Sequence, residues 1–324
     1  MEYVLECRKI AKRYSGLKLG GIDFCLEPGY ILGVIGENGA GKTSLMRLIL
    51  GGWQWDRIET RQVRWKQSVE GMEDRVSAMA AEGKIVVAGY DNRWHSEEAK
   101  QNLAYVMTDC PFPMTMSPLD NARIYGTAYD AWNQQVFLEK CRAYNVDVKK
   151  PLQKLSRGQC ILFQLAFALA HEAKLYIMDE PTGSLDVEVR EIFLDTMQEL
   201  VESGERSIVY VTNRLEDLEQ LGDYILWLHD GRQIAFERKD KLLERYLLVT
   251  GRESRFSEIK KLYPDYFLAE RSFPDSREAL IHADQNRFSL PGRCPTLEEL
   301  FYYHNLYMAE KRESFVEHVM DERV

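Results

Sequence analysis

The segment GENGAGKT at residues 36–43 constrains the fold of this chain more than any other stretch of its sequence. It follows a short apolar run at 30–35 that predicts a buried strand, and apolar residues at helical spacing come after it, at Leu45, Leu48 and Ile49. Glycines let such a loop turn tightly, so that successive backbone N–H groups point inward, and the helix start adds its positive dipole end. In this setting, G-x-x-x-x-G-K-[ST] predicts a phosphate-binding loop.

Two side chains of this loop have predicted roles. Lys42 would neutralise the β- and γ-phosphates of a nucleotide, and the Thr43 hydroxyl would ligate Mg²⁺. The alternative is a chance glycine-rich loop between a strand and a helix, which the surrounding pattern disfavours. The residues predicted to contact the nucleotide are Gly36, Asn38, Gly39, Ala40, Gly41, Lys42, Thr43 and Ser44.

A second apolar run, KLYIMDEP at 174–181, predicts a buried strand that ends in Asp179 and Glu180. Ligand chemistry in an α/β sheet gathers at the carboxyl ends of its strands. Asp179 is therefore expected to hold Mg²⁺, through water, and Glu180 to polarise an attacking water. The alternative, a strand that ends in two surface carboxylates, becomes minor beside a phosphate loop.

The alternation of strands and helices predicts the fold class. Alternating segments at 3–7 and 22–26 indicate half-buried antiparallel strands, whereas 174–179 and 207–212 are continuous apolar runs separated by helical pattern. Such alternation predicts an α/β fold with a mostly parallel sheet covered on both faces. Ser117, before Pro118, is a predicted helix cap, and helical pattern continues to about Tyr144.

Composition narrows the classes of function. The formal net charge of -9 disfavours nucleic acid or an anionic membrane as a passive partner. The start, MEYVLECRKI, lacks the pattern of a secretory signal, and no apolar run approaches the ~20 residues of a membrane span. The six cysteines and six histidines are dispersed, which predicts reduced thiols and no structural metal.

The phosphate loop and the carboxylate strand, with LSRGQ at 155–159 between them, resemble the nucleotide-binding subunit of ATP-binding cassette (ABC) transporters over roughly residues 2–237. The resemblance implies a P-loop NTPase fold at 1–238, with an antiparallel β subdomain and a helical subdomain at about 108–170. It also implies ATP and Mg²⁺ as cofactors, ATPase activity, and a separate membrane permease as partner. In the family two subunits pair head to tail, and ATP is buried between them.

Further residues match family positions. Tyr14, upstream of the phosphate loop, matches the aromatic residue that stacks on adenine. The signature residues Ser156, Gly158 and Gln159 would close over the nucleotide of the opposite subunit, with a helix N-terminus as a second anion site. A plain helix cap is the alternative for Ser156. Asp186, in the segment 184–186, matches residues that touch the other subunit.

At the first departure from the family pattern, the usual glutamine after a strand is missing. The chain reads YVMTDCPFP there, with Thr108 or Asp109 in its place. We favour Asp109, which could ligate Mg²⁺ and act in catalysis, although its charge lies beside phosphates. Residues 111–124, which follow, are the candidate surface for docking to the permease.

At the second departure, Asn213 stands where the family has a histidine that donates to the γ-phosphate and helps to place the attacking water. An asparagine amide donates too, but it never charges, and its nitrogen reaches roughly 2 Å less far. One missing transition-state donor typically costs ~10²–10³ in rate. Because Lys42, Asp179 and Glu180 are intact, we predict a catalytic site that hydrolyses ATP slowly and binds it well.

The segments 168–186, 223–234 and 295–304 resemble export-type bacterial subunits, including relatives of bacitracin-resistance and Ytr-type systems. The resemblance implies a cytoplasmic protein, peripheral on the inner face of the membrane, paired as a homodimer or heterodimer. Two alternatives are a regulatory, degenerate ABC subunit with little turnover and a soluble ABC protein without a transport role. The stretch 52–83 is interpreted as an insertion, and 239–324 as a small α+β extension. Neither has a role that the sequence assigns, and the transported substrate is not determined by it.

Overall fold

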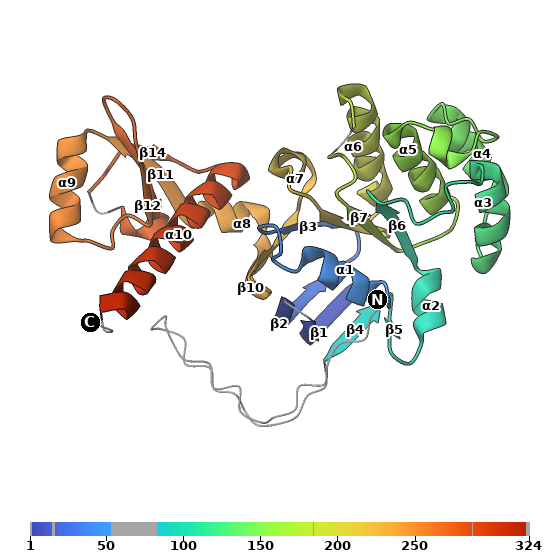
Figure 1. Cartoon of the computed structure of the whole chain (residues 1–324), viewed down its shortest axis with the longest axis horizontal. Coiled ribbons are helices and arrows are strands. Elements are labelled where there is room, and N and C mark those ends of the chain that lie inside the picture. The colour runs from blue at the N-terminus through green and yellow to red at the C-terminus, as the bar shows by residue number, and fades with distance from the viewer. Residues whose placement is uncertain (1, 15–16, 53–82, 184, 287, 322–324) are drawn as a thin grey trace. The chain divides into compact units, whose positions relative to one another are not determined.

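The computed structural model describes residues 2–14, 17–52, 83–183, 185–286 and 288–321, and of residues 14, 17–18 and 310–321 only the backbone (Figure 1). The predicted insertion at 52–83 therefore lies, except for its two end residues, outside the described residues. Contacts divide the chain into two compact units, residues 1–213 with 226–236 and residues 214–225 with 237–324.

Ten strands form one mixed sheet with the order β5-β4-β1-β2-β10-β9-β3-β8-β7-β6. The strands β3, β8, β7 and β6 are parallel, whereas β1 pairs antiparallel with both β2 and β4. This is the predicted combination of a parallel core and an antiparallel part. The strands are β1 (Leu5–Tyr14), β2 (Leu17–Leu26), β3 (Ile31–Ile35), β4 (Lys84–Val87), β5 (Tyr90–Asp91), β6 (Leu103–Met107), β7 (Leu175–Asp179), β8 (Ser207–Val211), β9 (Tyr224–His229) and β10 (Arg232–Arg238).

The central parallel strands are buried along almost their whole length. Every residue of β3 and β8 is buried, and β7 is buried up to its last residue, Asp179. Strands covered on both faces need apolar side chains in every position, which explains their continuous apolar runs. Asp179 pairs in register with Val211 on one side and with Met107 on the other, so the loops that follow these strands leave the sheet at one edge.

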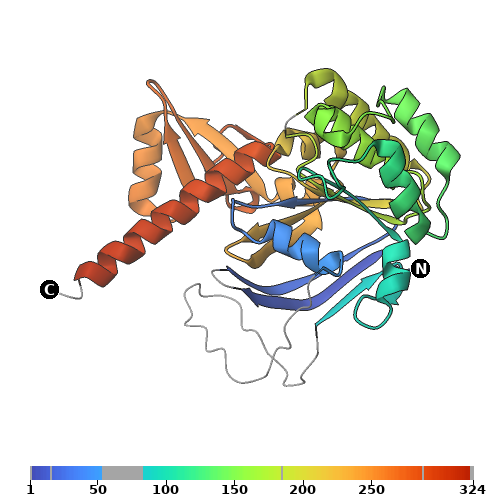
Figure 2. The same cartoon turned by 45° about the vertical axis from the view of Figure 1, so that its right-hand side comes forward.

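Six helices accompany the sheet in the described part of the first unit, and those of the helical subdomain gather together beside α6 in both Figure 1 and Figure 2. They are α1 (Lys42–Ile49), α2 (Ser96–Gln101), α3 (Pro118–Tyr125), α4 (Gln134–Ala143), α5 (Arg157–Ala168) and α6 (Val187–Glu202). The predicted cap before Pro118 is confirmed, because the Ser117 hydroxyl accepts from the Asp120 N–H at 3.2 Å.

The prediction of continuous helical pattern to Tyr144 is wrong in one respect. The helix α3 ends at Tyr125, and α4 begins at Gln134 with Asn133 as its cap. Between them Gly126 lies under the ring of Trp132, where a Cβ would come within 2.5 Å of the indole. The chain turns here so that Trp132 can pack against Phe167 and Phe137, at ring centroid distances of 4.7 and 5.7 Å.

The second unit is an α+β fold of its own. An antiparallel sheet has the order β12-β13-β11-β14, and its core cluster includes Val249, Phe256 and Phe267. Phe256 and Phe267 stack at a centroid distance of 4.6 Å. The elements are α7 (Leu215–Leu221), α8 (Lys239–Glu244), β11 (Tyr246–Gly251), α9 (Glu253–Leu262), β12 (Ala269–Ser272), β13 (Arg277–His282), β14 (Gly292–Arg293) and α10 (Leu297–Asp321).

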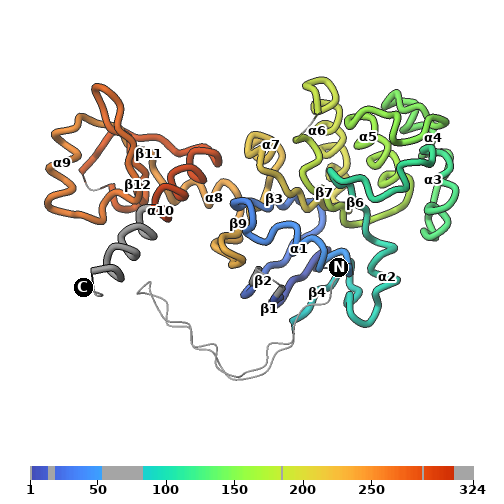
Figure 3. Tube along the Cα trace, viewed as in Figure 1, coloured from blue at the N-terminus to red at the C-terminus, as the bar shows by residue number. Residues whose placement is uncertain are grey.

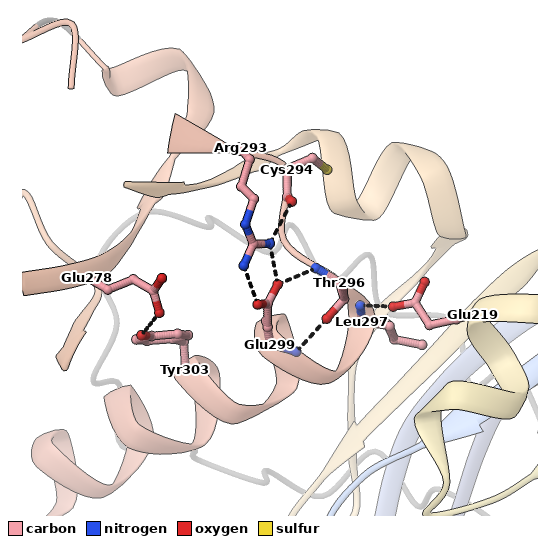
Figure 4. Close-up of polar contacts among 8 residues, drawn as sticks. All are labelled: Glu219, Glu278, Arg293, Cys294, Thr296, Leu297, Glu299 and Tyr303. Carbon is pink, nitrogen blue, oxygen red and sulfur yellow. Dashed lines mark hydrogen bonds and ion pairs between the residues drawn. The ribbon is translucent and has the colours of Figure 1, made fainter. Parts of the chain in front are cut away.

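The start of α10 is held by charged groups of the second unit (Figure 4). Thr296 and Glu299 cap each other, since the Glu299 N–H donates to the Thr296 hydroxyl and the Thr296 N–H donates to the Glu299 carboxylate. Arg293 pairs with the Glu299 carboxylate through both terminal nitrogens of its guanidinium group. The Leu297 N–H donates to Glu219 of α7. Acidic groups at a helix N-terminus are favourable because they oppose the helix dipole.

Among the residues that the structure describes, no helix combines the length and the apolar character that a membrane crossing requires.

Candidate nucleotide site

The loop between β3 and α1 has the backbone shape that only glycine allows. Gly36, Gly39 and Gly41 have φ angles of +153°, +85° and +102°. A Cβ on Gly36 would lie 2.3 Å from the carbonyl oxygen of Leu228, and one on Gly41 would lie 2.7 Å from a methyl of Leu19. The main chain therefore curls closely over the start of α1, as Figure 3 traces, and can approach an anion there without side chains between them.

Lys42 begins α1 and is folded back into this loop, with only 8% of its surface exposed. Its ammonium donates to the carbonyl oxygens of Gly36 at 2.5 Å and Glu37 at 3.3 Å, and to the side-chain oxygen of Asn213 at 3.0 Å. These three acceptors, which the described residues supply, are all neutral. A phosphate would supply the charge that a buried cation favours.

Burial lowers the pKa of Lys42 from its usual value, and the negative charges of Glu180 and Asp179 act in the opposite direction. The two carboxylates lie at the end of β7, which is separated from β3 by β8, and their charges reach Lys42 from there. Thr43 is exposed beside Lys42, and Ser44 is partly exposed. The hydroxyls of Thr43 and Ser44 are therefore accessible to a ligand on the first turn of α1.

Glu180 has a left-handed backbone conformation, with φ at +51°. Its N–H donates to the carbonyl of Val211 at 2.8 Å, which extends the β7–β8 pairing by one residue. Its carboxylate accepts from the N–H of Asn213 at 3.1 Å. Asn213 thus touches Glu180 with its backbone and Lys42 with its side chain.

The carboxyl of Asp179 has a raised pKa, because burial disfavours its charge. The positive charges of Lys42 and Arg47 lower the pKa in part, and the charge of Asp109 raises it further. Nearby oxygen donors of this kind suit Mg²⁺, which is usually held by one or two protein groups together with phosphates. The described residues contain no cluster of three or more His, Cys, Asp or Glu side chains able to hold a metal.

Asp109 and Thr108 occupy different places after β6. Asp109 is exposed and reaches the site through its charge on Asp179. The Thr108 hydroxyl, in contrast, donates to the carbonyl oxygens of Glu180 at 2.8 Å and Asp179 at 3.2 Å. Sequence reasoning named Thr108 only as the less favoured occupant of the family glutamine position and gave it no contact.

A profile of the family described as "ABC transporter" matches residues 19–183, which is more than half of the chain. This chain belongs to the ABC transporter family. One relative is the galactose/methyl galactoside import ATP-binding protein MglA of Fusobacterium nucleatum, 26% identical over 262 residues, covering 78% of this chain and 48% of the relative. Another is the xylose import ATP-binding protein XylG of Ralstonia nicotianae, 27% identical over 286 residues, covering 83% of this chain and 51% of the relative. The chain thus spans about half the length of these curated relatives.

Solved structures confirm the ABC ATPase fold. An ATP binding subunit of an ABC transporter superposes with a TM-score of 0.61 at 22% identity, over 74% of this chain and 91% of that one. The ATP-binding cassette MJ0796, solved as a post-hydrolysis dimer with ADP and Pi, has a TM-score of 0.58 at 17% identity, over 72% of this chain and 98% of that one. At these identities the likeness concerns the fold.

The residues predicted to form the signature, Ser156, Gly158 and Gln159, lie at the start of α5, far along the chain from the phosphate loop. The Ser156 hydroxyl accepts from the Gln159 N–H, and the Gln159 side chain accepts from the Ser156 N–H, both at 3.1 Å. Ser156 is therefore a helix cap. Its contact with the nucleotide of an opposite subunit stays a prediction. Gly158 faces Leu185 and Val189, near the start of α6, where a Cβ would have ordinary contacts at 3.6–3.7 Å.

Asp186 caps α6, since its carboxylate accepts from the Val189 N–H at 2.9 Å. The signature loop and this cap are thus neighbours on two adjacent helices. Two parts of the prediction lie outside what the structure describes. They are the side chain of Tyr14, the predicted adenine partner, and Ser184.

Gln164 is a site-shaping residue that sequence reasoning missed. It is 1% exposed in the middle of α5, and its amide pairs with both the N–H and the carbonyl of Met107, each at 3.0 Å. The pair ties α5 to the end of β6, directly before Thr108. The signal was a single polar residue inside the apolar run ILFQLAFAL.

Proposed function

We propose that the chain is the ATP-binding and hydrolysing subunit of an ABC transporter, which pairs around Mg·ATP and drives a separate membrane permease. The observation that carries this proposal is the chain of contacts from the ammonium of Lys42 through Asn213 to the carboxylate of Glu180. A candidate phosphate-binding cation and a candidate general base are thereby connected at the carboxyl ends of the parallel strands.

In this proposal the nucleotide phosphates lie on the backbone of residues 36–43, and Lys42 turns from neutral oxygens toward them. Thr43 and Asp179 would hold Mg²⁺, which supplies charge neutralisation between the phosphates when it is bound. Glu180 would take a proton from the attacking water. Asp109, exposed next to Thr108, adds negative charge near Asp179 and is retained as a proposed outer ligand of the metal.

The partner subunit would complete the site. Ser156, Gly158 and Gln159 at the start of α5 offer a hydroxyl and a helix N-terminus to the γ-phosphate of an opposite chain. Asp186 caps the neighbouring helix and would face the same interface. In such a dimer, ATP would bind between two subunits and hold them together. The subunits would be either two copies of this chain or this chain and a related one.

The permease would dock on the helical subdomain. Met114, Ile124 and Tyr125, all within the predicted docking segment or directly after it, are 40%, 51% and 40% exposed. Phe112 is buried, with its ring 5.6 Å from that of Tyr125. Apolar side chains on the loop after β6 and at the end of α3 would hold the subunit on the inner face of the membrane through its permease.

The direction of transport is a separate matter. Resemblance of three segments predicts export, whereas MglA and XylG are named import ATP-binding proteins. The export direction therefore gains no support from these relatives, and sugar uptake is the alternative that their names offer. The proposal of a transport ATPase is the same in both cases.

The asparagine at position 213 supports a more specific proposal, that this site hydrolyses ATP slowly. A lysine ammonium donates only, so the side-chain oxygen of Asn213 faces Lys42, and the shorter amide nitrogen is the donor that would replace the family histidine. The same observation favours the second candidate, a regulatory ABC subunit that binds ATP with little turnover. The transport ATPase and the regulatory subunit can be distinguished by whether any ATP hydrolysis depends on Glu180.

The test is calorimetry with Mg·ATP together with phosphate release from the full chain and three variants. Lys42→Met should lose ATP affinity, and Glu180→Gln should keep the affinity while hydrolysis falls by at least ~10². Lys174→Met, which alters an exposed lysine of the same unit, is the matched control and should behave like the wild type. Equal ATP affinity in Lys42→Met and the wild type would contradict the site, and hydrolysis that is independent of Glu180 would contradict the enzyme.

A further inference from the structure

We propose that Thr108 is a positioning residue for hydrolysis, because its hydroxyl holds the main chain of Glu180 in the conformation that presents the Glu180 carboxylate. The inference rests on the proposed function and adds to it a residue that acts through Glu180. It is carried by three contacts between the end of β6 and the end of β7.

The first step is the backbone of Glu180. A φ of +51° lies in the left-handed region, which is strained for a residue with a Cβ and persists only where its surroundings enforce it. On one side of the peptide, the Glu180 N–H donates to Val211 at 2.8 Å. On the carbonyl side, the Gly183 N–H donates to the Glu180 carbonyl at the long distance of 3.4 Å, and the following residue, Pro181, has no N–H to pair, so a closer restraint is needed there.

Thr108 supplies that restraint. Its N–H donates to the carbonyl of Asp179 at 3.1 Å, which continues the parallel β6–β7 ladder one residue past the strand. The backbone pairing ends there, and the next contact is made by the side chain. The Thr108 hydroxyl donates to the Glu180 carbonyl at 2.8 Å, which is shorter than its 3.2 Å contact with the Asp179 carbonyl. Thr108 thus contacts both carboxylate-bearing residues of the site through their main-chain oxygens.

The other end of Glu180 is held from β8. Its carboxylate accepts from the Asn213 N–H at 3.1 Å, so Glu180 is fixed at its N–H, its carbonyl and its side chain by two flanking strands. If the hydroxyl of Thr108 were removed, the carbonyl would lose its 2.8 Å contact and retain the Gly183 N–H at 3.4 Å, while the contacts of the Glu180 N–H and carboxylate stayed. The carboxylate would then sample directions away from the attacking water, which lowers kcat with little effect on the phosphate loop.

The side chain of Thr108 is itself exposed, so it contributes little to the core. This matters for the test, because the isosteric variant Thr108→Val removes one hydroxyl and changes no buried volume. Thr108→Ser keeps the hydroxyl and removes only the methyl. Thr127 offers a matched control: its exposed hydroxyl donates to a carbonyl, that of Ile124 at 2.7 Å, and it lies on another element.

The experiment measures phosphate release against ATP concentration, and Mg·ATP affinity by calorimetry, for the full chain and its variants. Thr108→Val should lower kcat about 5- to 10-fold, the range of one neutral hydrogen bond, with less than about a 2-fold change in KM and affinity. Thr108→Ser should stay within about 2-fold of the wild-type kcat, and Thr127→Val should match the wild type. A purely structural role for Thr108 would not produce this split or this rescue.

The outcomes separate the two proposals. A wild-type kcat in Thr108→Val, an equal loss in Thr108→Ser, or a loss of ATP affinity in place of kcat would overturn the positioning role while Glu180→Gln still abolished turnover. If the wild type and Glu180→Gln released phosphate at the same rate, the proposed enzyme itself would be wrong.

Discussion

The ammonium of Lys42 and the side-chain oxygen of Asn213 meet at 3.0 Å, although 171 positions separate them in the chain. Asn213 also contacts Glu180 through its N–H, so a single residue after β8 connects the phosphate loop to the candidate base. The family places a histidine at this position. In the proposed site, the asparagine contacts both Lys42 and Glu180 and would reach less far toward a γ-phosphate than a histidine.

Asn213→His is expected to raise kcat for ATP hydrolysis by ~10- to 100-fold, because the imidazole restores a longer donor beside Glu180. Steady-state phosphate release, with KM determined in parallel, provides the measurement. Asn213→Ala serves as control and should be no faster than the wild type. A wild-type rate that equals or exceeds that of Asn213→His would reject the slow-site hypothesis.

Binding of Mg·ATP is expected to stabilise the wild type and not the Lys42→Met variant. At 100 times the Kd, a ligand that binds only the folded state contributes about 2.7 kcal/mol. For a domain of this size the gain corresponds to a rise in Tm of roughly 5–10 °C. Thermal unfolding with and without Mg·ATP measures it, and an equal rise in both proteins would show that Lys42 does not contact the phosphates.

Gly126→Ala is expected to destabilise the first unit by about 1–3 kcal/mol, because the added methyl would lie 2.5 Å from the Trp132 ring. Gly20→Ala is the matched control, since a Cβ added there would have no atom within 4 Å and the φ of Gly20 is outside the left-handed range. Urea unfolding followed by tryptophan fluorescence compares the two. Similar midpoints for both variants would mean that the Trp132 ring moves aside at no cost.

The pairing of Glu299 with Arg293 should make the second unit sensitive to acid (Figure 4). Hydrogen bonds from Arg293 lower the pKa of Glu299 to about 2, below its usual value of 4.5. Because the folded-state pKa is depressed, the stabilisation is complete above pH 4.5 and is lost as the pH falls from there toward 2. Glu299→Gln should lack this pH dependence.

Hydrogen exchange of the first turn of α10, compared between pH 6 and pH 3, follows that change locally. Glu298→Gln, which alters an exposed carboxylate on the same turn, should respond to pH as the wild type does. If the protection of α10 in Glu299→Gln fell with pH as steeply as in the wild type, the Arg293 pair would not be its source.

The local elements of the site were predictable because their signals lie within a few consecutive residues. The glycine pattern at 36–43, the carboxylates after an apolar run and the cap at Ser117 each depend on neighbours in the chain. The break between α3 and α4 was missed because it depends on Gly126 meeting Trp132, which periodicity does not report. The second unit was predicted only as a small α+β extension, without the long helix α10, since its strands are short and pair across intervening segments.

The sequence by itself determined that a loop able to cradle phosphate follows one strand and that two carboxylates follow another. Tertiary structure alone decided which side chains connect them: Asn213 to Lys42, and Thr108 to Glu180, over 171 and 72 positions of chain. Backbone conformation at a glycine-rich turn is fixed by sterics within a few residues, so it can be inferred from the letters. Contacts between the ends of separate strands depend on the order and register of the whole sheet, which arise only when the chain has folded.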